Sequence, residues 1–316
     1  MTPHIIIVNY RTAGLTLDCL RTLAPEAEAC GARCTVVDGA SGDDSVDRLA
    51  PHIDTLPWCD FLPLQTNGGF AYGNNRGIEH AFKNFPDTDA IWLLNPDTRV
   101  RPGALRHLVD FLATKPECGI AGGNALHEDE TPMCCAFGFP TLLGEIENTL
   151  RFGPVTKLLR EKRISGVMYD EPTAVGWVAG ASMLVRKDVF DAIGLLDEGF
   201  FMYYEEVDFC RRALDHGWST WHVPASEIIH LVGASSGVTG SKRAQKRRPR
   251  YWFDSRRRYF LRHLGRARTA VADVAWLANT PAARFLDVLR RNPRNDPPRL
   301  WRDFAKHNLT ADLTGR

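Results

Sequence analysis

The chain is organised around the stretch Ile91-Trp-Leu-Leu-Asn-Pro-Asp-Thr98. Residues 91–94 form a short apolar run without a helical or alternating period, which is typical of a strand buried on both faces. Pro96 ends the run, because proline cannot donate a ladder hydrogen bond and favours an extended conformation for the residue before it. The strand therefore delivers the carboxylate of Asp97 to its carboxyl end, where open α/β sheets bind ligands. An alternative is that Asp97 caps a helix beginning near Pro102.

Similar strand ends occur upstream. His4–Val8 is rich in β-branched residues, Cys34–Val37 ends in an Asp-Gly turn, and Phe61–Leu64 runs into a loop rich in Asn and Gly. Predicted helices separate these strands, and a short fifth strand is expected at Gly119–Gly122. Strands that alternate with helices predict a mostly parallel sheet. The alternation is lost over residues 125–172, which favours a lid or an insertion.

Regular patterns return in the last third of the chain. Trp177–Val185 is predicted to be one buried strand, and a helix is expected to open at the carboxylates 205–208. A further helix is predicted at about Tyr251–Leu264, followed by helical pieces that prolines such as Pro281 should break.

Composition limits the class of protein. The 316 residues suffice for one large α/β domain or two smaller ones. No segment reaches the ~20 apolar residues of a spanning helix, and the N-terminus lacks a signal-peptide pattern, so we expect a cytoplasmic protein. The eight cysteines form no Cys-x-x-Cys pair and are expected to be reduced, without zinc. The net charge is +1, but residues 241–268 carry twelve Lys and Arg against Asp254 alone, which indicates affinity for anions.

Six motifs carry a resemblance when they are taken together and in order. They are Ile-Val-Asn-Tyr (7–10), Val-Val-Asp-Gly-Ala-Ser (36–41), Asn-Gly-Gly-Phe-Ala-Tyr-Gly-Asn-Asn (67–75), Leu-Leu-Asn-Pro-Asp-Thr (93–98), Phe-Met-Tyr-Tyr-Glu-Glu-Val-Asp-Phe (201–209) and Ile-Ile-His-Leu-Val-Gly-Ala-Ser-Ser (228–236). Over residues 3–265 the chain resembles family 2 glycosyltransferases of the GT-A fold, and most closely bacterial rhamnosyltransferases of cell-surface polysaccharide assembly.

The resemblance implies an α/β, Rossmann-like GT-A fold: a mostly parallel sheet flanked by helices, with a C-terminal helical extension. It implies three parts: a nucleotide-sugar-binding half (1–124), an acceptor-binding and catalytic half (125–240) and a basic helical extension (241–316). The implied reaction is inverting transfer of a sugar, which overall resemblance indicates to be rhamnose, from a dTDP- or UDP-sugar to a hydroxyl of a glycan or lipid-linked acceptor.

The strand-end loops suit a nucleotide. The carboxylate of Asp38 can accept the N–H of uracil or thymine, and Val8 and Tyr10 can wall the ring; alternatively, Asp38 only shapes its turn. Glycines 68, 69 and 73 would let the protein backbone approach the nucleotide; alternatively, they form a turn that binds no ligand. The remaining candidates for nucleotide contact are Asn67, Gly69, Phe70, Asn74, Asn95 and Asp97.

The same resemblance implies a divalent cation, Mn²⁺ or Mg²⁺, to stabilise the diphosphate leaving group. Asp97 is the expected carboxylate ligand and His230 the second ligand, although a histidine at a strand end is often structural. Mn²⁺ accepts an imidazole more readily than Mg²⁺. Because Asn95 is uncharged, we expect weak metal binding without donor.

Inversion requires a base that takes the proton of the acceptor hydroxyl. The resemblance assigns this role to Glu206, with Glu205 in reserve, whereas Asp208 is expected to form structural ion pairs. All three carboxylates also suit the positive end of a helix dipole. Trp177 and Gly180 are expected on the acceptor or sugar side, since a Trp face stacks on sugar C–H groups; core packing is the alternative for Trp177.

The basic segment 241–268 has three interpretations: closure over the donor diphosphate, peripheral contact with an anionic membrane, or a solvated face. Its interleaved aromatic residues favour membrane contact at the inner face of the cell membrane. A nucleic-acid binder would use the same charges, but no nucleic-acid recognition motif accompanies them, and we expect no nucleic-acid partner. A sugar-phosphate nucleotidyltransferase would need a glycine-rich basic loop after the first strand, which residues 9–13 do not supply.

Overall fold

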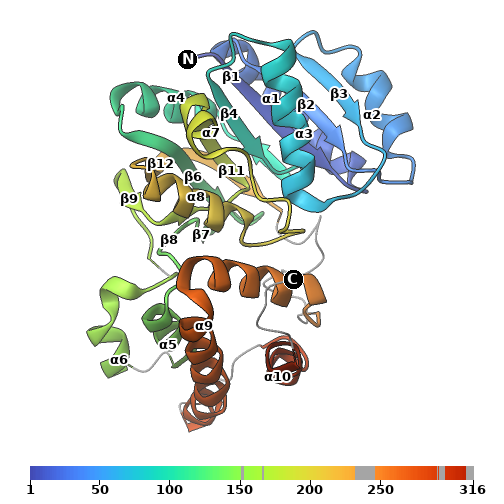
Figure 1. Cartoon of the computed structure of the whole chain (residues 1–316). Helices are drawn as coiled ribbons and strands as arrows, with labels where there is room; N and C mark the ends of the chain where they lie inside the picture. Colours follow the sequence, from blue (N-terminus) through green and yellow to red (C-terminus); the bar gives the residue numbers. More distant parts are fainter. Residues whose placement is uncertain (151–152, 166, 232–245, 290, 292–295, 311–316) are drawn as a thin grey trace.

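The computed structural model describes residues 1–150, 153–165, 167–231, 246–289, 291 and 296–310. Figure 1 shows a sheet flanked by helices above, and a smaller helical unit below it. The expected α/β architecture with a C-terminal helical extension is confirmed. The motif at 228–236 is described only as far as Leu231, so its last five residues lie outside the described part.

The sheet is mixed. Its strand order is β3 (Cys59–Pro63), β2 (Arg33–Asp38), β1 (Pro3–Asn9), β4 (Ala90–Leu94), β11 (Ser182–Arg186), β6 (Cys118–Leu126), β12 (Ser219–His230) and β5 (Thr98–Val100). The first four strands are parallel, and β11 is inserted antiparallel between β4 and β6. Short strands β7 (Pro132–Met133) and β9 (Thr173–Val175) pair with β6 and β12. The expected boundary at 124/125 falls inside β6.

Two apolar cores cover the two faces of the sheet. Trp92 and Leu94 of β4 belong to one core, with α1 (Ala13–Cys30), α2 (Ser45–Ile53) and α4 (Ala104–Thr114). Ile91 and Leu93 belong to the other, with α3 (Gly69–Asn84), α7 (Lys187–Ile193) and α8 (Glu205–Asp215). The alternation explains why residues 91–94 read as an unbroken apolar run, since both faces of β4 are buried.

The predicted strand Trp177–Val185 is wrong in one respect. The chain forms β10 (Trp177–Val178), which pairs with β8 (Ala136–Phe137), and then turns before β11. The turn at residues 179–181 makes loop contacts instead of ladder bonds: the amide of Ala179 donates to Cys135, and the carbonyl of Ala181 accepts from Asn95. Residues Ser219–His230 form one strand, β12, whose pairing with β6 shifts register between Val223 and Glu227.

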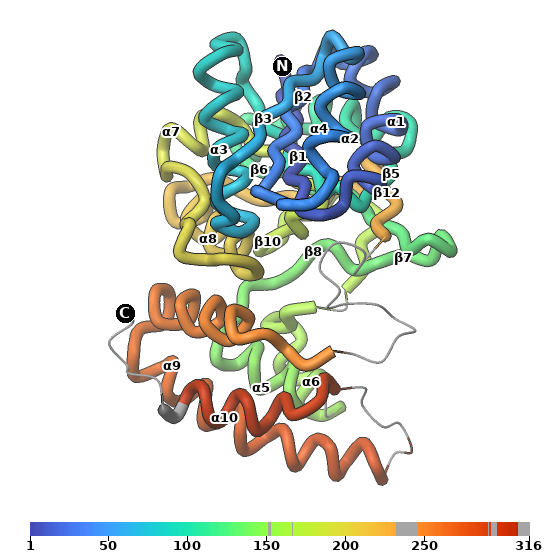
Figure 2. The backbone as a smooth tube through the Cα atoms, turned by 90° about the vertical axis from the view of Figure 1, so that its right-hand side faces the viewer, coloured from blue at the N-terminus to red at the C-terminus, as the bar shows by residue number. Residues whose placement is uncertain are grey.

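The lower unit combines α5 (Leu142–Leu150), α6 (Gly153–Leu158), the 3₁₀ turn Arg160–Lys162, α9 (Arg250–Leu289) and α10 (Leu300–Thr310). Figure 2 shows α9 changing direction and α10 lying along its second half. The change occurs at Gly265, whose φ of 75° is not helical.

The expected break at Pro281 is wrong, because α9 continues through it. Proline leaves the carbonyl four residues earlier without its helical donor. That carbonyl belongs to Leu277, and it accepts a hydrogen bond of 3.0 Å from the indole N–H of Trp301 in α10. The tertiary contact therefore compensates for the bond that Pro281 removes.

Much of the positive charge at residues 246–268 is used inside the molecule. Arg256 is buried and pairs with Glu145 of α5 and Asp273 of α9. Arg258 and Arg262 both pair with Asp197 beside α8. The pairs of Arg258 and Arg262 with Asp197 join the helical unit to the sheet domain, whereas those of Arg256 lie within the helical unit. Among the described helices, none has the length and apolar character needed to span a bilayer.

Candidate active site

Asp97 and His230 are brought together by the pairing of β5 with β12. The register places His230 opposite Thr98, and the amide of Leu231 donates to the carbonyl of Asp97. The imidazole Nε2 of His230 lies 3.3 Å from Oδ1 of Asp97 and 3.4 Å from Nδ2 of Asn95. Asp97 does not cap α4, since the carboxylate of Glu26 accepts from the amides of Gly103 and Leu105 there.

The donor set of this pair fits a divalent cation. Two ligands about 2.1 Å from one ion lie roughly 3 Å apart when their angle at the ion is near 90°, which matches the 3.3 Å between the two side chains. Among the described residues, no group of three or more His, Cys, Asp or Glu side chains gathers in a metal-binding arrangement. A cation held by Asp97 and His230 would therefore find no third His, Cys, Asp or Glu ligand beside them within the described part of the chain.

Glu205 and Glu206 open α8. Glu205 is 4% exposed and Glu206 is partly buried. Burial raises the pKa of Glu206 to about 7, although the amides of Glu206, Val207 and Gly180 stabilise its anion. Burial, and then the charge of Glu206, raise the pKa of Glu205 well above its ordinary value. One oxygen of each carboxyl has no hydrogen-bond partner among the described residues.

The residues just before α8 have an unusual backbone. Tyr203 and Tyr204 have φ values of 72° and 70°, a conformation that side-chain-bearing residues adopt rarely and at a cost. Asp208, in the first turn of α8, connects this helix to α9. It is fully buried and accepts from Arg212 at 2.8 Å and His263 at 2.8 Å, so its expected structural role agrees with its geometry.

The turn at residues 179–181 connects the two acidic regions. The amide of Gly180 stabilises the Glu206 carboxylate, and the carbonyl of the next residue, Ala181, accepts from the amide of Asn95 at 3.1 Å. A Cβ on Gly180 would lie 3.4 Å from the ring of Phe70 and 3.8 Å from Cβ of Glu206. The break in the predicted strand therefore places Gly180 between Phe70, Glu206 and the Asn-Pro-Asp loop.

The glycine-rich loop before and within α3 is held against the chain that leads into α8. The amide of Phe70 donates to the carbonyl of Phe201 at 2.9 Å, and a Cβ on Gly69 would lie 2.0 Å from that oxygen. Asn67 accepts from the amide of Gly69. Position 69 therefore requires glycine for two reasons that the sequence pattern did not indicate. The carbonyl of Phe201 approaches too closely for a Cβ, and the backbone has a φ of 89°.

Two further members of this loop have internal partners. Asn74 is buried and donates to the carbonyl of Phe70 at 2.9 Å. A Cβ on Gly73 would lie 2.7 Å from Val8, so this glycine admits the side chain of a β1 residue and lets α3 approach the sheet. Gly73 therefore has a packing role, and the expected approach of its backbone to the nucleotide stays a prediction.

Asp38 lies at the carboxyl end of β2, as expected, and is buried by its neighbours. It accepts from Asn9 at 2.7 Å and from the hydroxyl and amide of Ser41 at 2.6 and 3.0 Å. Tyr10 remains 39% exposed beside this network. Asn9 and Ser41 hold this carboxylate, and the sequence interpretation did not single them out, although both belong to motifs that follow a strand. For Asn9 the available signal was a polar side chain directly after the predicted strand His4–Val8, whereas Ser41 is marked only as part of the Asp-Gly-Ala-Ser turn.

Trp177 has one face covered. Its ring stacks on Phe137 with centroids 4.1 Å apart, and its indole N–H donates to the carbonyl of Gly138. It also packs against both the second core and the helical unit's core. These contacts favour the alternative of core packing for Trp177, while its partial exposure leaves an acceptor contact as a prediction.

Comparison with known proteins agrees with the fold and with the motifs. A family model described as glycosyltransferase like family 2 matches residues 4–260. The N-acetylglucosaminyl-diphospho-decaprenol L-rhamnosyltransferase of Mycobacterium tuberculosis is 29% identical over 58% of this chain and 62% of its own length. Rhamnosyltransferase WbbL of Escherichia coli is 29% identical over 52% of this chain and 61% of its own. The chain thus spans about three fifths of these relatives.

Solved structures show the same fold. The mannosyltransferase of Pyrobaculum calidifontis, in complex with GDP-Man and Mn²⁺, aligns with a TM-score of 0.55 at 13% identity over 91% of this chain and 75% of that chain. GalNAc-T7 with UDP, GalNAc and Mn²⁺ aligns with a TM-score of 0.55 at 14% identity over 73% and 44%. The family model covers well over half of the sequence, and the chain therefore belongs to the glycosyltransferase-like family 2.

Proposed function

We propose that this protein is an inverting glycosyltransferase that moves a sugar, rhamnose in the first instance, from a dTDP- or UDP-sugar to a hydroxyl of a glycan or lipid-linked acceptor. One observation carries the proposal. Glu206, with a pKa raised to about 7, shares the turn at 179–181 with the loop that holds Asp97. The proposed base and the proposed cation ligand thus lie on the two sides of one turn, beside the carboxyl end of β4.

Glu206 is the proposed general base. As the acceptor oxygen bonds to the anomeric carbon, its proton moves to the Glu206 carboxylate, and the bond from that carbon to the diphosphate oxygen breaks. Attack from the face opposite the leaving group inverts the anomeric configuration. A base works best when its pKa lies near the operating pH, which suits a carboxyl with a pKa of about 7.

Asp97 and His230 are proposed to hold a divalent cation, Mn²⁺ in preference to Mg²⁺, which when bound would offset charge on the diphosphate. The 3.3 Å separation of their donor atoms supports this assignment. With a single carboxylate in the loop, the protein alone should bind the ion weakly, and the donor diphosphate should complete its ligands.

The nucleotide is proposed to lie along the ends of β1, β2 and α3. Asp38 would receive the base N–H on Oδ2, the oxygen that accepts from the Ser41 amide, and the exposed ring of Tyr10, with Val8, would lie against the base. Asn67, Gly69, Phe70 and Asn74 would bound the sugar-phosphate side. The names of the rhamnosyltransferase relatives support rhamnose as the first donor to test.

The test is a transfer assay over a panel of dTDP-, UDP- and GDP-sugars with Mn²⁺, Mg²⁺ or EDTA, using a lipid-diphosphate sugar as acceptor and donor hydrolysis as a second readout. We expect turnover of a dTDP- or UDP-sugar that requires the cation and falls by at least a hundredfold in Asp97→Ala. Arg21→Ala, an exposed residue on α1, is the matched surface control. Activity restricted to GDP-sugars, or equal activity with EDTA, would contradict the proposal.

A further inference from the structure

The second half of α9, residues 266–289, exposes an apolar face. Positions recurring every three or four residues lie along one side of a helix. On this side the large apolar residues are more than half exposed: Val271 is 54%, Val274 60%, Phe285 65% and Val288 68% exposed. Exposed small residues lie between them at Ala267, Ala278, Pro281 and Ala282. We call this set, together with Leu289, the α9 stripe.

The α9 stripe is not the face that packs on the protein. The opposite side of the same helix holds the buried residues Thr269, Ala272, Asp273, Thr280, Ala283 and Asp287. That side contacts α5 and α10, and Trp276 stacks on Phe304 of α10 with centroids 4.0 Å apart. The helix is thus apolar on two sides, one of which has its partner within the chain. At about 1.5 Å per residue, the exposed side extends over roughly 33 Å.

The charges beside the α9 stripe are of one sign. The exposed charged residues of this half-helix are Arg266, Arg268 and Arg284, whereas both of its acids, Asp273 and Asp287, are buried on the other side. Arg284 pairs with Asp296, and no ion pair is recorded for Arg266 or Arg268 within the described part of the chain. An apolar strip on a helix that exposes arginines and none of its own acids matches the interface of an anionic bilayer.

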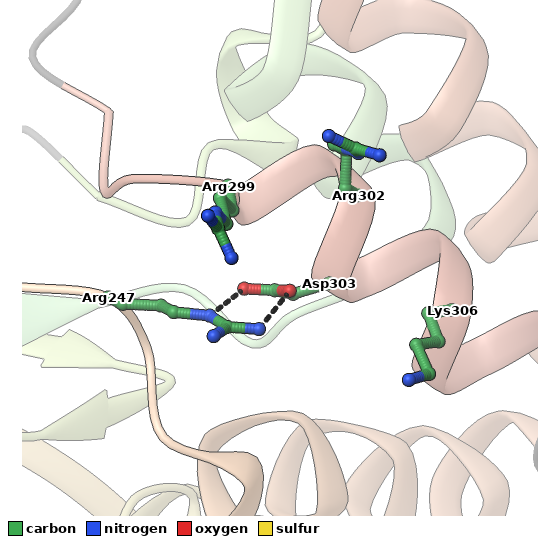
Figure 3. A pocket seen from close by; sticks show the side chains of 5 residues that line it. All are labelled: Arg247, Arg299, Arg302, Asp303 and Lys306. Atoms are coloured by element: carbon green, nitrogen blue, oxygen red, sulfur yellow. Dashed lines mark hydrogen bonds and ion pairs between the residues drawn. The ribbon is translucent and has the colours of Figure 1, made fainter.

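The C-terminal part of the chain that contains the α9 stripe has the same charge bias. Residues 246–310 contain seventeen Lys and Arg against five Asp. A hollow of about 550 Å³ on α10 is lined by Arg247, Arg299, Arg302 and Lys306 around the single acid Asp303 (Figure 3). Arg247 binds both oxygens of that acid. A second copy of the chain would bring arginine against arginine along the stripe, which opposes association, while anionic lipid would be attracted.

We propose that the α9 stripe is a membrane-docking surface that lies in the interface of a bilayer rich in anionic phospholipid. This places the contact on residues 266–289, which overlap the segment expected from sequence, 241–268, only at residues 266–268. Most arginines between residues 246 and 265 are used in internal ion pairs. The exposed apolar side chains enter the acyl boundary, and the flanking arginines contact lipid phosphates. The surface is separate from Glu206 and Asp97, so its role does not depend on the transfer reaction.

The test is co-sedimentation of the full chain with vesicles of phosphatidylcholine alone or with added phosphatidylglycerol. We expect binding to the anionic vesicles that weakens as salt rises, and at least a tenfold loss of binding in the double variant Val274→Glu/Phe285→Glu. The matched control is Val46→Glu/Leu214→Glu, which places the same charges at exposed apolar positions of α2 and α8. It should bind as the natural protein does.

Two measurements distinguish the other outcomes. Far-ultraviolet circular dichroism and the unfolding midpoint should be unchanged in both double variants, since all four positions are exposed. Light scattering gives the oligomeric state. If the natural protein does not bind anionic vesicles, or if V274E/F285E binds them as well as the control does, the proposal is wrong. If that variant converts a dimer to a monomer without affecting vesicle binding, the stripe is an interface between copies instead.

Discussion

Replacing Glu206 by glutamine should stabilise the protein above neutral pH and remove the proposed general base. Burial raises the pKa of Glu206 from 4.5 to about 7. A carboxyl whose pKa is higher in the folded than in the unfolded state favours folding only while protonated, so stability is lost as pH rises from about 4.5 to 7. At about 1.36 kcal/mol per pKa unit, the full loss is about 3 kcal/mol. Glutamine cannot ionise, so the variant should not lose this unfolding free energy as pH rises.

The assay is urea unfolding of the natural protein and Glu206→Gln at pH 4 and pH 8. Because Gln resembles the protonated acid, the two proteins should differ little at pH 4, and the variant should be more stable by about 3 kcal/mol at pH 8. Glu28→Gln, at an exposed position of α1, controls for the loss of one negative charge. A change between the two pH values below about 1 kcal/mol would refute the claim that the fold desolvates this carboxylate.

Three further predictions concern the loops and their supports. Gly69→Ala should cost about 1–3 kcal/mol of unfolding free energy and raise the donor KM, because it adds a clash with a backbone carbonyl to an unfavourable φ; Gly31→Ala, which has a positive φ and open space, should cost less. His230→Gln should require roughly tenfold more Mn²⁺ for half-maximal activity; an unchanged requirement in titration would exclude His230 as a ligand. Burial alone would raise the pKa of Asp208, but hydrogen bonds from His263 and Arg212 outweigh burial, and the net effect is a lowered pKa. The ionised carboxylate therefore stabilises the fold above about pH 4, and this stabilisation is lost in acid. Asp208→Asn should therefore cost about 3 kcal/mol at pH 7 and less at pH 3, as thermal unfolding at the two pH values would reveal.

The central strand and the strand-end site were predictable from local pattern. The run at residues 91–94 is apolar because both faces of β4 meet a core, and Pro96 ends it where the pattern indicates. The pairing of Asp97 with His230 was expected only from resemblance. It depends on β5 lying beside the end of β12, more than a hundred residues later, and no local signal encodes that register.

Tertiary contacts account for the features that the sequence did not predict. The strand expected at 177–185 breaks at Gly180 because Asn95 and Glu206 both bind the turn there. The helix continues through Pro281 because Trp301, twenty residues later, supplies the missing hydrogen bond. The basic segment reads as an anion-binding surface, yet Arg256 is buried between Glu145 and Asp273, which are distant in sequence.

The most direct test of the account is the rate of sugar transfer by Glu206→Gln and by Glu205→Gln, measured beside the natural protein at pH 8 with saturating donor, acceptor and Mn²⁺. Both glutamates open α8 and both have raised pKa values, but the amide of Gly180 faces Glu206. We expect E206Q to lose at least about a hundredfold in kcat, the range of a lost general base, with donor binding retained by calorimetry, and E205Q to keep most of its activity. Near-natural transfer by E206Q would contradict the assignment of the base and the proposal built on it.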